Sequence, residues 1–243
     1  MCRMFGYAGS SRKDLEALYS ALKKASSCDD CIKQMIPGHD GWHQHGWGYV
    51  IRTADQLFHY RSITPANEDK HRLPEFKGEI QAIFHVRLST GGVLGDPSFS
   101  HPYVGYTDQA TIFFAHNGGL KNAALIVPNK VDSEWAFDQL RREGDVATTL
   151  PKLKENTSSA LNLLVMTINR QARQATVNYL NWYTGYGDPA RDGYYRMHQA
   201  TMVQGGQAVF SSTLEPLLKR HITKGGNQPV TYGELQTLGL PSK

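Results

Sequence analysis

The chain has 243 residues, of which 40% are hydrophobic and 20% are charged, as in an ordinary folded protein. Its formal net charge is +4, and it contains neither a run of five or six like charges nor a basic tract interleaved with aromatic residues, which argues against nucleic-acid binding. No stretch approaches the roughly 20 apolar residues of a membrane span or resembles a signal peptide, and three cysteines are too few for a disulfide framework. We therefore expect a cytoplasmic protein that binds neither membrane nor nucleic acid and folds as one domain over residues 1–243.

The first half of the chain predicts one helix followed by several strands. Leucines at helical spacing predict a helix over Arg12–Lys24 with Ser11 as its N-cap. The polar stretch Ser26–His45 indicates a helix end and a loop. Strand-like runs follow at 46–53, 56–63 and 79–88, and the stretch 105–119 indicates a further strand that ends in a turn. The run at 79–88 is apolar enough to be covered on both faces.

The second half predicts two helices and then four more strands. The helices are Ser133–Glu143, capped by Asp132 or Ser133, and Val146–Glu155. The strands are expected at 160–170, 175–184, 194–204 and 207–213. A short helix over Leu214–Lys219 and a helical turn near Tyr232–Leu238 end the chain. Hairpin-like connections dominate, which favours an α+β fold with stacked, largely antiparallel sheets between helix layers.

Cys2 directly follows Met1, so removal of the methionine makes it the first residue. A thiol with a reference pKa of about 8.5 is only partly ionised at neutral pH and needs a base. A chain-terminal α-amine, with a pKa of about 8, supplies that base on the same residue. The alternative is an incidental cysteine, so the companion motifs must decide.

The run FFAHNGGL at 113–120 ends an apolar strand in polar residues. Attack on an amide carbonyl develops a negative oxygen, which a side-chain amide and a backbone N–H can bind. Asn117 offers the amide, and Gly118 offers an N–H that no side chain obstructs. A plain hairpin turn is the alternative, because Asn-Gly is a common hairpin dipeptide.

Two further motifs offer charged groups for an amino-acid substrate. FHVRLSTGG at 84–92 places Arg87 near the end of a covered strand, where its guanidinium suits a carboxylate of the protein or of a ligand. Thr90 and the glycines after it add further donors. Asp132 in VDSEWAF either caps a helix or binds an ammonium group. Arg87 and Asp132 would then hold the two charged ends of an amino acid while Cys2 attacks its side-chain carbonyl.

This ordered set of motifs resembles the class II glutamine amidotransferases, a family of N-terminal nucleophile hydrolases. The stretches that carry the resemblance are MCRMFGYAG (1–9), HGWGYV (45–50), FHVRLSTGG (84–92), SHPYV (100–104), FAHNGGL (114–120), VDSE (131–134) and VFSSTLEPL (209–217). Each motif is weak singly, but they follow the family's order and span nearly the whole chain.

The resemblance implies a four-layer α-β-β-α sandwich with two stacked, mainly antiparallel sheets. It implies that glutamine is hydrolysed through a cysteine thioester to glutamate and ammonia, with no cofactor and no metal. The matching positions are the nucleophile Cys2, the oxyanion-hole residues Asn117 and Gly118, and the substrate-binding residues Arg87, Thr90 and Asp132.

Three more positions are candidates without an assigned chemistry. His101 of SHPYV matches a family position near the site. The loop GHDGWHQHGWGYV holds the family's Asp-Gly-Trp-Gly pattern twice, with an insertion. We align Trp47 and Gly48 with that pattern because a strand follows directly, which puts His45 where an aspartate is usual.

Several alternatives stay open. Cys28 and Cys31 with His39, His43 and His45 offer sulfur and imidazole ligands for zinc, although the spacing is shorter than in a zinc finger. Incidental thiols or a redox pair explain the same cysteines. The glutaminase fold would use the whole chain, so ammonia would pass to a separate synthase subunit, or the substrate would be another γ-glutamyl amide or peptide. A non-catalytic binding or regulatory module on the same fold is the last alternative.

Overall fold

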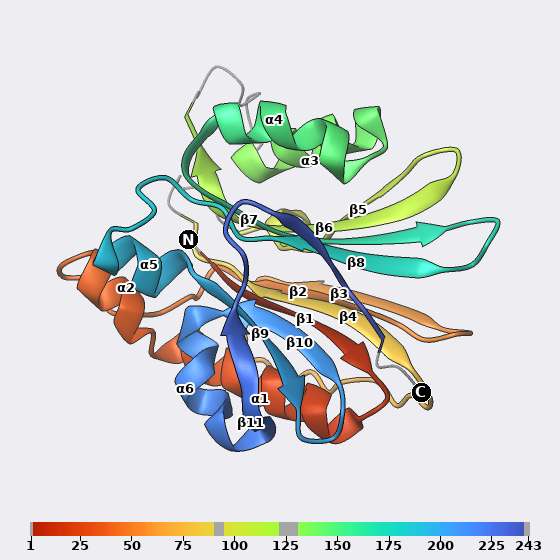
Figure 1. Ribbon diagram of the computed structural model, residues 1–243, viewed down its shortest axis with the longest axis horizontal. Coiled ribbons are helices and arrows are strands. Elements are labelled where there is room, and N and C mark those ends of the chain that lie inside the picture. The colour runs from red at the N-terminus through yellow and green to blue at the C-terminus, as the bar shows by residue number, and fades with distance from the viewer. Residues whose placement is uncertain (1, 90–94, 122–130, 241–243) are drawn as a thin grey trace.

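The computed structural model describes residues 2–89, 95–121 and 131–240. Two antiparallel sheets stack face to face, and helices cover the outer face of each (Figure 1). The helices are α1 (Arg12–Ser27), α2 (Asp30–Met35), α3 (Asp132–Glu143), α4 (Val146–Glu155), α5 (Pro189–Tyr195) and α6 (Glu215–Leu218). None of the helices in these described ranges is long and apolar enough to cross a membrane. The predicted α+β sandwich of four layers, α-β-β-α, is therefore confirmed.

The two sheets differ in width. The seven-stranded sheet runs in the order β11 (Ile222–Pro229), β9 (Met197–Met202), β10 (Gln207–Ser211), β1 (Arg3–Gly9), β4 (Ile80–Val86), β2 (Trp47–Arg52) and β3 (Leu57–Ser62). The five-stranded sheet runs in the order β12 (Leu235–Leu238), β8 (Ala175–Leu180), β7 (Thr157–Asn169), β6 (Ala110–Leu120) and β5 (Tyr103–Tyr106). Because β1 pairs with both β4 and β10, the residue before it lies at the end of a central strand.

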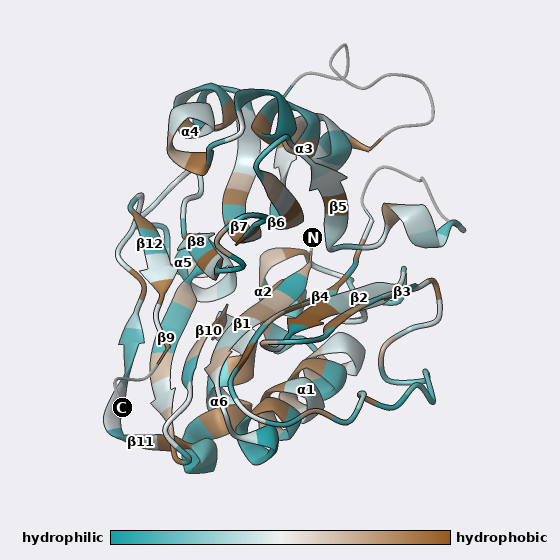
Figure 2. Cartoon of the chain, turned by 90° about the vertical axis from the view of Figure 1, so that its right-hand side faces the viewer, coloured by the Kyte–Doolittle hydropathy of each residue, from teal (hydrophilic) through white to brown (hydrophobic). Residues whose placement is uncertain are grey.

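Side-chain alternation along the strands divides the apolar residues between layers. Phe5 and Tyr7 of β1 pack on the α1 side, whereas Met4 and Ala8 pack between the sheets. On β6, Phe113 lies between the sheets and the next residue faces α3 and α4. Figure 2 shows the apolar stretches gathered on the central strands, with polar residues on the loops and outer helix surfaces.

The predicted helices form with small differences at their ends. Ser11 caps α1, because its side chain accepts the N–H of Asp14 at 3.2 Å, and α1 continues to Ser27. The expected caps of α3 were wrong. Asp132 is already the first helical residue, and the carboxylate of Glu134 instead accepts the N–H of Val131 at 2.8 Å.

Two helices form where the sequence predicted none. The Asp29 carboxylate accepts the N–H groups of Cys31 and Ile32 and so begins α2 within the stretch that was expected to be a loop. Asp188 caps α5 in the same way, and the strand expected at 194–204 begins only at β9.

The strand predictions also need corrections. The expected helical turn near the C-terminus is strand β12, which pairs with β8, and β11 was not predicted. The single strand expected at 105–119 is a hairpin of β5 and β6. Asn117 and Gly118 lie inside β6 and pair with β7, with a register shift between Gly118 and Leu120, so they do not form the predicted turn.

Candidate active site

Cys2 joins the two sheets at the start of β1. It shares the inter-sheet face with Met4, two residues later, and is 7% exposed. Its backbone N–H donates a hydrogen bond to Oδ1 of Asn117 on β6 at 2.8 Å. Its Sγ lies 3.9 Å from the carbonyl oxygen of Leu88. Strand β1 of the seven-stranded sheet is therefore tied at this residue to β6 of the five-stranded sheet.

The thiol of Cys2 lies in a setting that favours its ionised form. Burial raises the pKa of the Cys2 thiol, but the chain-terminal ammonium and His85 outweigh burial and lower it to about 5. The thiolate is the nucleophilic form of cysteine. A lowered thiol pKa is typical of a reactive cysteine.

Asn117 is fully buried beside the thiol. Its Oδ1 accepts the N–H of Cys2, which fixes the orientation of the amide. Its Nδ2 is buried and has no hydrogen-bond partner among the described residues. A buried donor left unpaired costs about 1–3 kcal/mol, so this group is suited to a negative oxygen that arises during a reaction.

Gly118 follows Asn117 where β6 and β7 come very close. A Cβ at this position would lie 1.7 Å from the carbonyl oxygen of Ala160. Only glycine fits, so packing alone accounts for the residue type. Its role as an oxyanion donor stays a prediction.

Arg87 lies one residue beyond β4, opposite Cys2 if the register of β1 and β4 is extended by one step. Its backbone N–H donates to the Gly46 carbonyl at 2.8 Å, and its own carbonyl accepts the N–H of His45 at 3.1 Å. The side chain is 5% exposed, and its guanidinium lies 5.9 Å from the ring centre of Phe99. The loop before β2 therefore holds Arg87 next to the thiol. Thr90, its predicted companion, lies outside the described residues.

Asp132 lies at the junction of β6 and α3. Its Oδ2 accepts the N–H of Leu120 at 3.0 Å, and its Oδ1 accepts the N–H of Ser133 at 2.8 Å. These bonds fix the carboxylate at the end of the strand that carries Asn117. The structure thus provides an immobilised anionic group at the helix start.

Three buried histidines support the site, and the sequence assigned none of them a role. Nε2 of His85 donates to the carbonyl of His116 at 3.1 Å. Nε2 of His116 donates to the Ala160 carbonyl at 3.2 Å, so its Nδ1 accepts the Ser133 hydroxyl at 2.9 Å. His101 packs edge-on against His85, with 4.3 Å between ring centres. Burial, followed by the charge of His85, lowers the pKa of His101 well below its usual value.

Arg3, the residue after the candidate nucleophile, belongs to a fully buried polar cluster. Its Nε lies 2.6 Å from Oδ2 of Asp29, and its Nη1 donates to the Tyr194 carbonyl at 2.9 Å. Its guanidinium also lies 3.7 Å from the centre of the Tyr194 ring. His43 reaches the same Asp29 oxygen at 2.8 Å. The cluster ties β1 to α2 and α5, and the sequence did not indicate it because neither helix was predicted.

Trp47 and Gly48 have structural explanations. Trp47 lies on the face of the sheet that packs on α1, away from the thiol, and its Nε1 donates to Asp69 at 2.8 Å. The structure therefore does not bring Trp47 into the site. A Cβ on Gly48 would lie 2.4 Å from the carbonyl oxygen of Tyr60 and 2.5 Å from that of His101. Because Gly48 has no side chain, the backbone at His101 can pack close to it.

The side chains considered for zinc have other partners. His43 bonds to Asp29, and Nδ1 of His45 accepts the N–H of Ser89 at 2.8 Å. Nδ1 of His39 accepts a backbone N–H at 2.9 Å. Within residues 2–89, 95–121 and 131–240, no three metal-ligating side chains converge on one point. The geometry therefore does not favour the zinc alternative.

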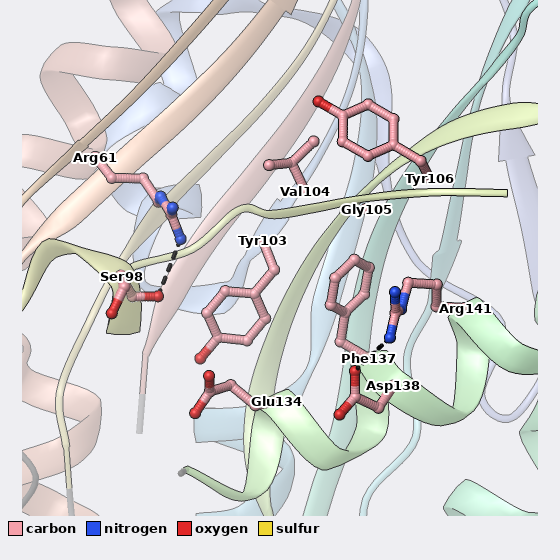
Figure 3. Close-up of a pocket in the computed structure, with 10 residues that line it drawn as sticks. All are labelled: Arg61, Ser98, Tyr103, Val104, Gly105, Tyr106, Glu134, Phe137, Asp138 and Arg141. Carbon is pink, nitrogen blue, oxygen red and sulfur yellow. Dashed lines mark hydrogen bonds and ion pairs between the residues drawn. The ribbon is translucent and has the colours of Figure 1, made fainter. Parts of the chain in front are cut away.

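A cavity of about 370 Å³ opens between β5 and α3 (Figure 3). Its lining residues are Arg61, Ser98, Tyr103, Val104, Gly105, Tyr106, Glu134, Phe137, Asp138 and Arg141. Figure 3 shows the Tyr103 ring and the Glu134 carboxylate together on one side, with Arg61 and Arg141 apart. Burial and then Glu134 raise the pKa of Tyr103, and Arg87 opposes them. Tyr103 thus lines this cavity and also packs against His101, with 4.3 Å between ring centres.

The fold is shared with two solved structures. One match, described as the allosteric regulatory enzyme of purine biosynthesis, has 20% sequence identity and a TM-score of 0.65. A second, glutamine phosphoribosylpyrophosphate amidotransferase from B. subtilis complexed with ADP and GMP, has 19% identity and a TM-score of 0.64. Each match covers 97% of this chain but only 46% and 47% of the respective structures, so the chain spans about half their length. No family model and no curated protein sequence matches the chain.

Proposed function

We propose that the protein hydrolyses the side-chain amide of glutamine, with Cys2 as the nucleophile once Met1 has been removed. The observation that carries the proposal is the contact between the two sheets, where the Cys2 N–H bonds to Oδ1 of Asn117 at 2.8 Å. This contact leaves the buried Nδ2 of Asn117 unpaired beside the thiol. A nucleophile and an oxyanion donor are thereby held together by one hydrogen bond.

The first step is attack by the Cys2 sulfur on the γ-carbonyl carbon of glutamine. The carbonyl oxygen gains negative charge, and Nδ2 of Asn117 with the N–H of Gly118 binds it. The tetrahedral intermediate then releases ammonia and leaves a glutamyl thioester. Attack by water on the thioester releases glutamate and restores the thiol. No step requires a cofactor or a metal ion.

Substrate binding uses two fixed charges. Arg87, with Thr90, binds the α-carboxylate, and a guanidinium–carboxylate pair is among the stronger charged hydrogen bonds. Asp132 binds the α-ammonium group. The bonds that Asp132 already accepts from Leu120 and Ser133 hold it still, so little ordering remains to be done when glutamine binds.

The fate of the ammonia is part of the proposal. We propose that the ammonia passes to an acceptor on a separate synthase subunit. A γ-glutamyl amide or peptide is the second candidate substrate.

Intact-mass spectrometry tests the proposal. The expected result is a mass without Met1 and, after treatment with a diazo-ketone analogue of glutamine, one adduct that peptide mapping places on Cys2. Glutamate and ammonia should form in equal amounts from glutamine, and Cys2→Ala should abolish both the adduct and the products. A protein that keeps Met1 and takes up no adduct would contradict the proposal and favour a non-catalytic module.

A comparison of substrates separates the two candidates. Glutamine and a set of γ-glutamyl dipeptides are compared by kcat/KM. A clear preference for the dipeptides, with glutamine turned over slowly, would favour the second candidate. Purification of the untagged protein with a synthase at fixed stoichiometry would favour the first.

A further inference from the structure

We propose that His85 is a second base for Cys2, so that a cysteine–histidine pair activates the thiol in addition to the chain-terminal amine. The inference rests on the proposed function for the reaction that the pair serves. It does not depend on that function for its main test, because the reactivity of the thiol is measured without substrate.

The strand register places His85 beside the thiol. β4 pairs with β1 so that His85 lies opposite Met4, whose side chain faces the second sheet. Cys2 is two residues before Met4 and shares that face. Diagonal neighbours on one face of an antiparallel pair lie within reach of a ring side chain. His85 is also one of the groups that act electrostatically on the Cys2 thiol.

The hydrogen bonds of His85 decide which ring nitrogen is available as a base. Nε2 lies 3.1 Å from the carbonyl oxygen of His116, which can only accept a hydrogen bond. Nε2 therefore carries the hydrogen in the neutral ring, and Nδ1 carries the lone pair. Nδ1 is fully buried and has no partner within the part of the chain that the structure describes. A buried acceptor without a donor is costly, and the thiol proton supplies a donor.

The groups around His85 do not compete for this role. The titratable groups that interact with it are Cys2 before β1, His101 before β5 and His116 on β6. Burial lowers the pKa of both His101 and His116, so both rings are neutral at neutral pH and add no positive charge. The chain-terminal amino group, when protonated, favours the thiolate of Cys2.

The proton transfer balances through the whole reaction. The Sγ–H bond of Cys2 breaks and an Nδ1–H bond forms on His85. The sulfur then bonds to the carbonyl carbon of the amide, and the electron pair of the C=O bond moves to oxygen. When the C=O bond re-forms, the C–N bond breaks. The leaving nitrogen takes the proton from Nδ1 and departs as ammonia, so His85 is neutral again in the thioester state.

The test measures how fast Cys2 is alkylated as a function of pH. Cys28→Ser and Cys31→Ser leave one thiol, and iodoacetamide adducts are counted by intact mass from pH 4 to pH 10. His85→Gln keeps an amide donor for the His116 carbonyl but removes the base. The variant should react at least tenfold more slowly than the parent at pH 6, and its profile should move upward by one pH unit or more.

His59→Gln is the matched control. His59 is also a strand histidine whose Nε2 donates to a backbone carbonyl, that of Pro102 at 2.9 Å, but its side chain is exposed. It is not among the groups that act on the Cys2 thiol, so its profile should superimpose on that of the parent. A His85→Gln profile that also superimposes on the parent, in a protein that melts normally, would overturn the inference.

A second measurement covers the case in which His85→Gln does not fold. The ring nitrogen shifts of His85 are recorded by NMR in the parent and in Cys2→Ser between pH 5 and pH 8. The Nδ1 shift should differ between the two proteins, and identical shifts would overturn the pair. Thiol reactivity that depends on His85 without glutaminase activity would contradict only the proposed function, whereas activity with unaltered alkylation would contradict only this inference.

Discussion

Replacing Asp29 by asparagine removes the only carboxylate that this structure, in its described ranges, pairs with the guanidinium of Arg3. Both side chains are completely buried. Removing one member of a buried pair leaves the other charge uncompensated, which costs about 3–5 kcal/mol. The asparagine oxygen still accepts the N–H groups of Cys31 and Ile32, so the cap of α2 survives. The substitution therefore isolates the charge.

The expected loss is a large part of the stability of a protein of this size. Free energies of unfolding are about 5–15 kcal/mol, and each kcal/mol shifts the melting temperature of a 150–250-residue domain by about 2–4 °C. The Asp29→Asn protein should therefore melt about 6–20 °C below the parent at pH 7. Because Arg3 adjoins Cys2, kcat for glutamine should also fall, whereas KM should change little, since Arg87 and Asp132 lie outside the cluster.

The stabilisation that Asp29 gives to the folded state depends on pH with a defined sign. Burial raises the pKa of Asp29, but Arg3 and His43 outweigh it and hold the pKa well below the ordinary value. A lowered pKa stabilises the folded state above the unfolded-state value of about 3.9, and this stabilisation is lost as the pH falls below it. Thermal unfolding of the parent and the variant is followed by circular dichroism. The difference between their melting temperatures should be largest at pH 7 and should shrink below about pH 4.

Asp145→Asn provides a control for this prediction. Asp145 also caps a helix, accepting the N–H of Thr148 at 2.9 Å, but it is exposed. Asparagine and aspartate cap helices about equally well, so the free energy of unfolding should change by no more than about 0.5 kcal/mol. If Asp29→Asn melts within a degree of the parent, the reasoning that the buried pair anchors the start of β1 is wrong.

Three further substitutions test the site. Arg87→Ala should raise KM for glutamine by roughly 10- to 150-fold through loss of a charged hydrogen bond of about 1.5–3 kcal/mol, and unchanged steady-state kinetics would remove Arg87 from the site. Asn117→Asp keeps an acceptor for the Cys2 N–H but loses the Nδ2 donor, so single-turnover rates should drop roughly 100- to 1000-fold while the alkylation of Cys2 persists. Gly48→Ala should destabilise the fold by about 1–3 kcal/mol in urea, because its Cβ would lie 2.4 Å from the Tyr60 carbonyl oxygen, and a neutral effect would refute that packing account.

The sequence predicted the regular elements well where one face is apolar. Helix α1 was predicted from the spacing of its leucines, and the central strands were predicted from nearly continuous apolar runs. Burial of these elements determines the spacing of their apolar residues, so the pattern is visible in the sequence. Helices α2 and α5 are six and seven residues long, and aspartate caps begin both of them. Such short helices are stabilised by tertiary contacts, which local periodicity does not encode. β12 forms only because β8 offers it an edge.

The sequence likewise indicated some residues of the candidate site and not others. Motifs identify Cys2 and Asp132 because each lies at the end of an element, and Asn117 because polar residues follow an apolar run there. His85 lies inside the run FHVRLSTGG, and a histidine in a strand covered on both faces was the available signal. Cys2 precedes the neighbouring strand β1 and His116 lies on β6 of the other sheet, so the chain order conceals both partners of His85. In the proposed reaction, the chemistry at Cys2 therefore depends on the pairing of β1 with β4 as much as on the residue at the chain start. A search for nucleophile–base pairs has to follow the register of the strands.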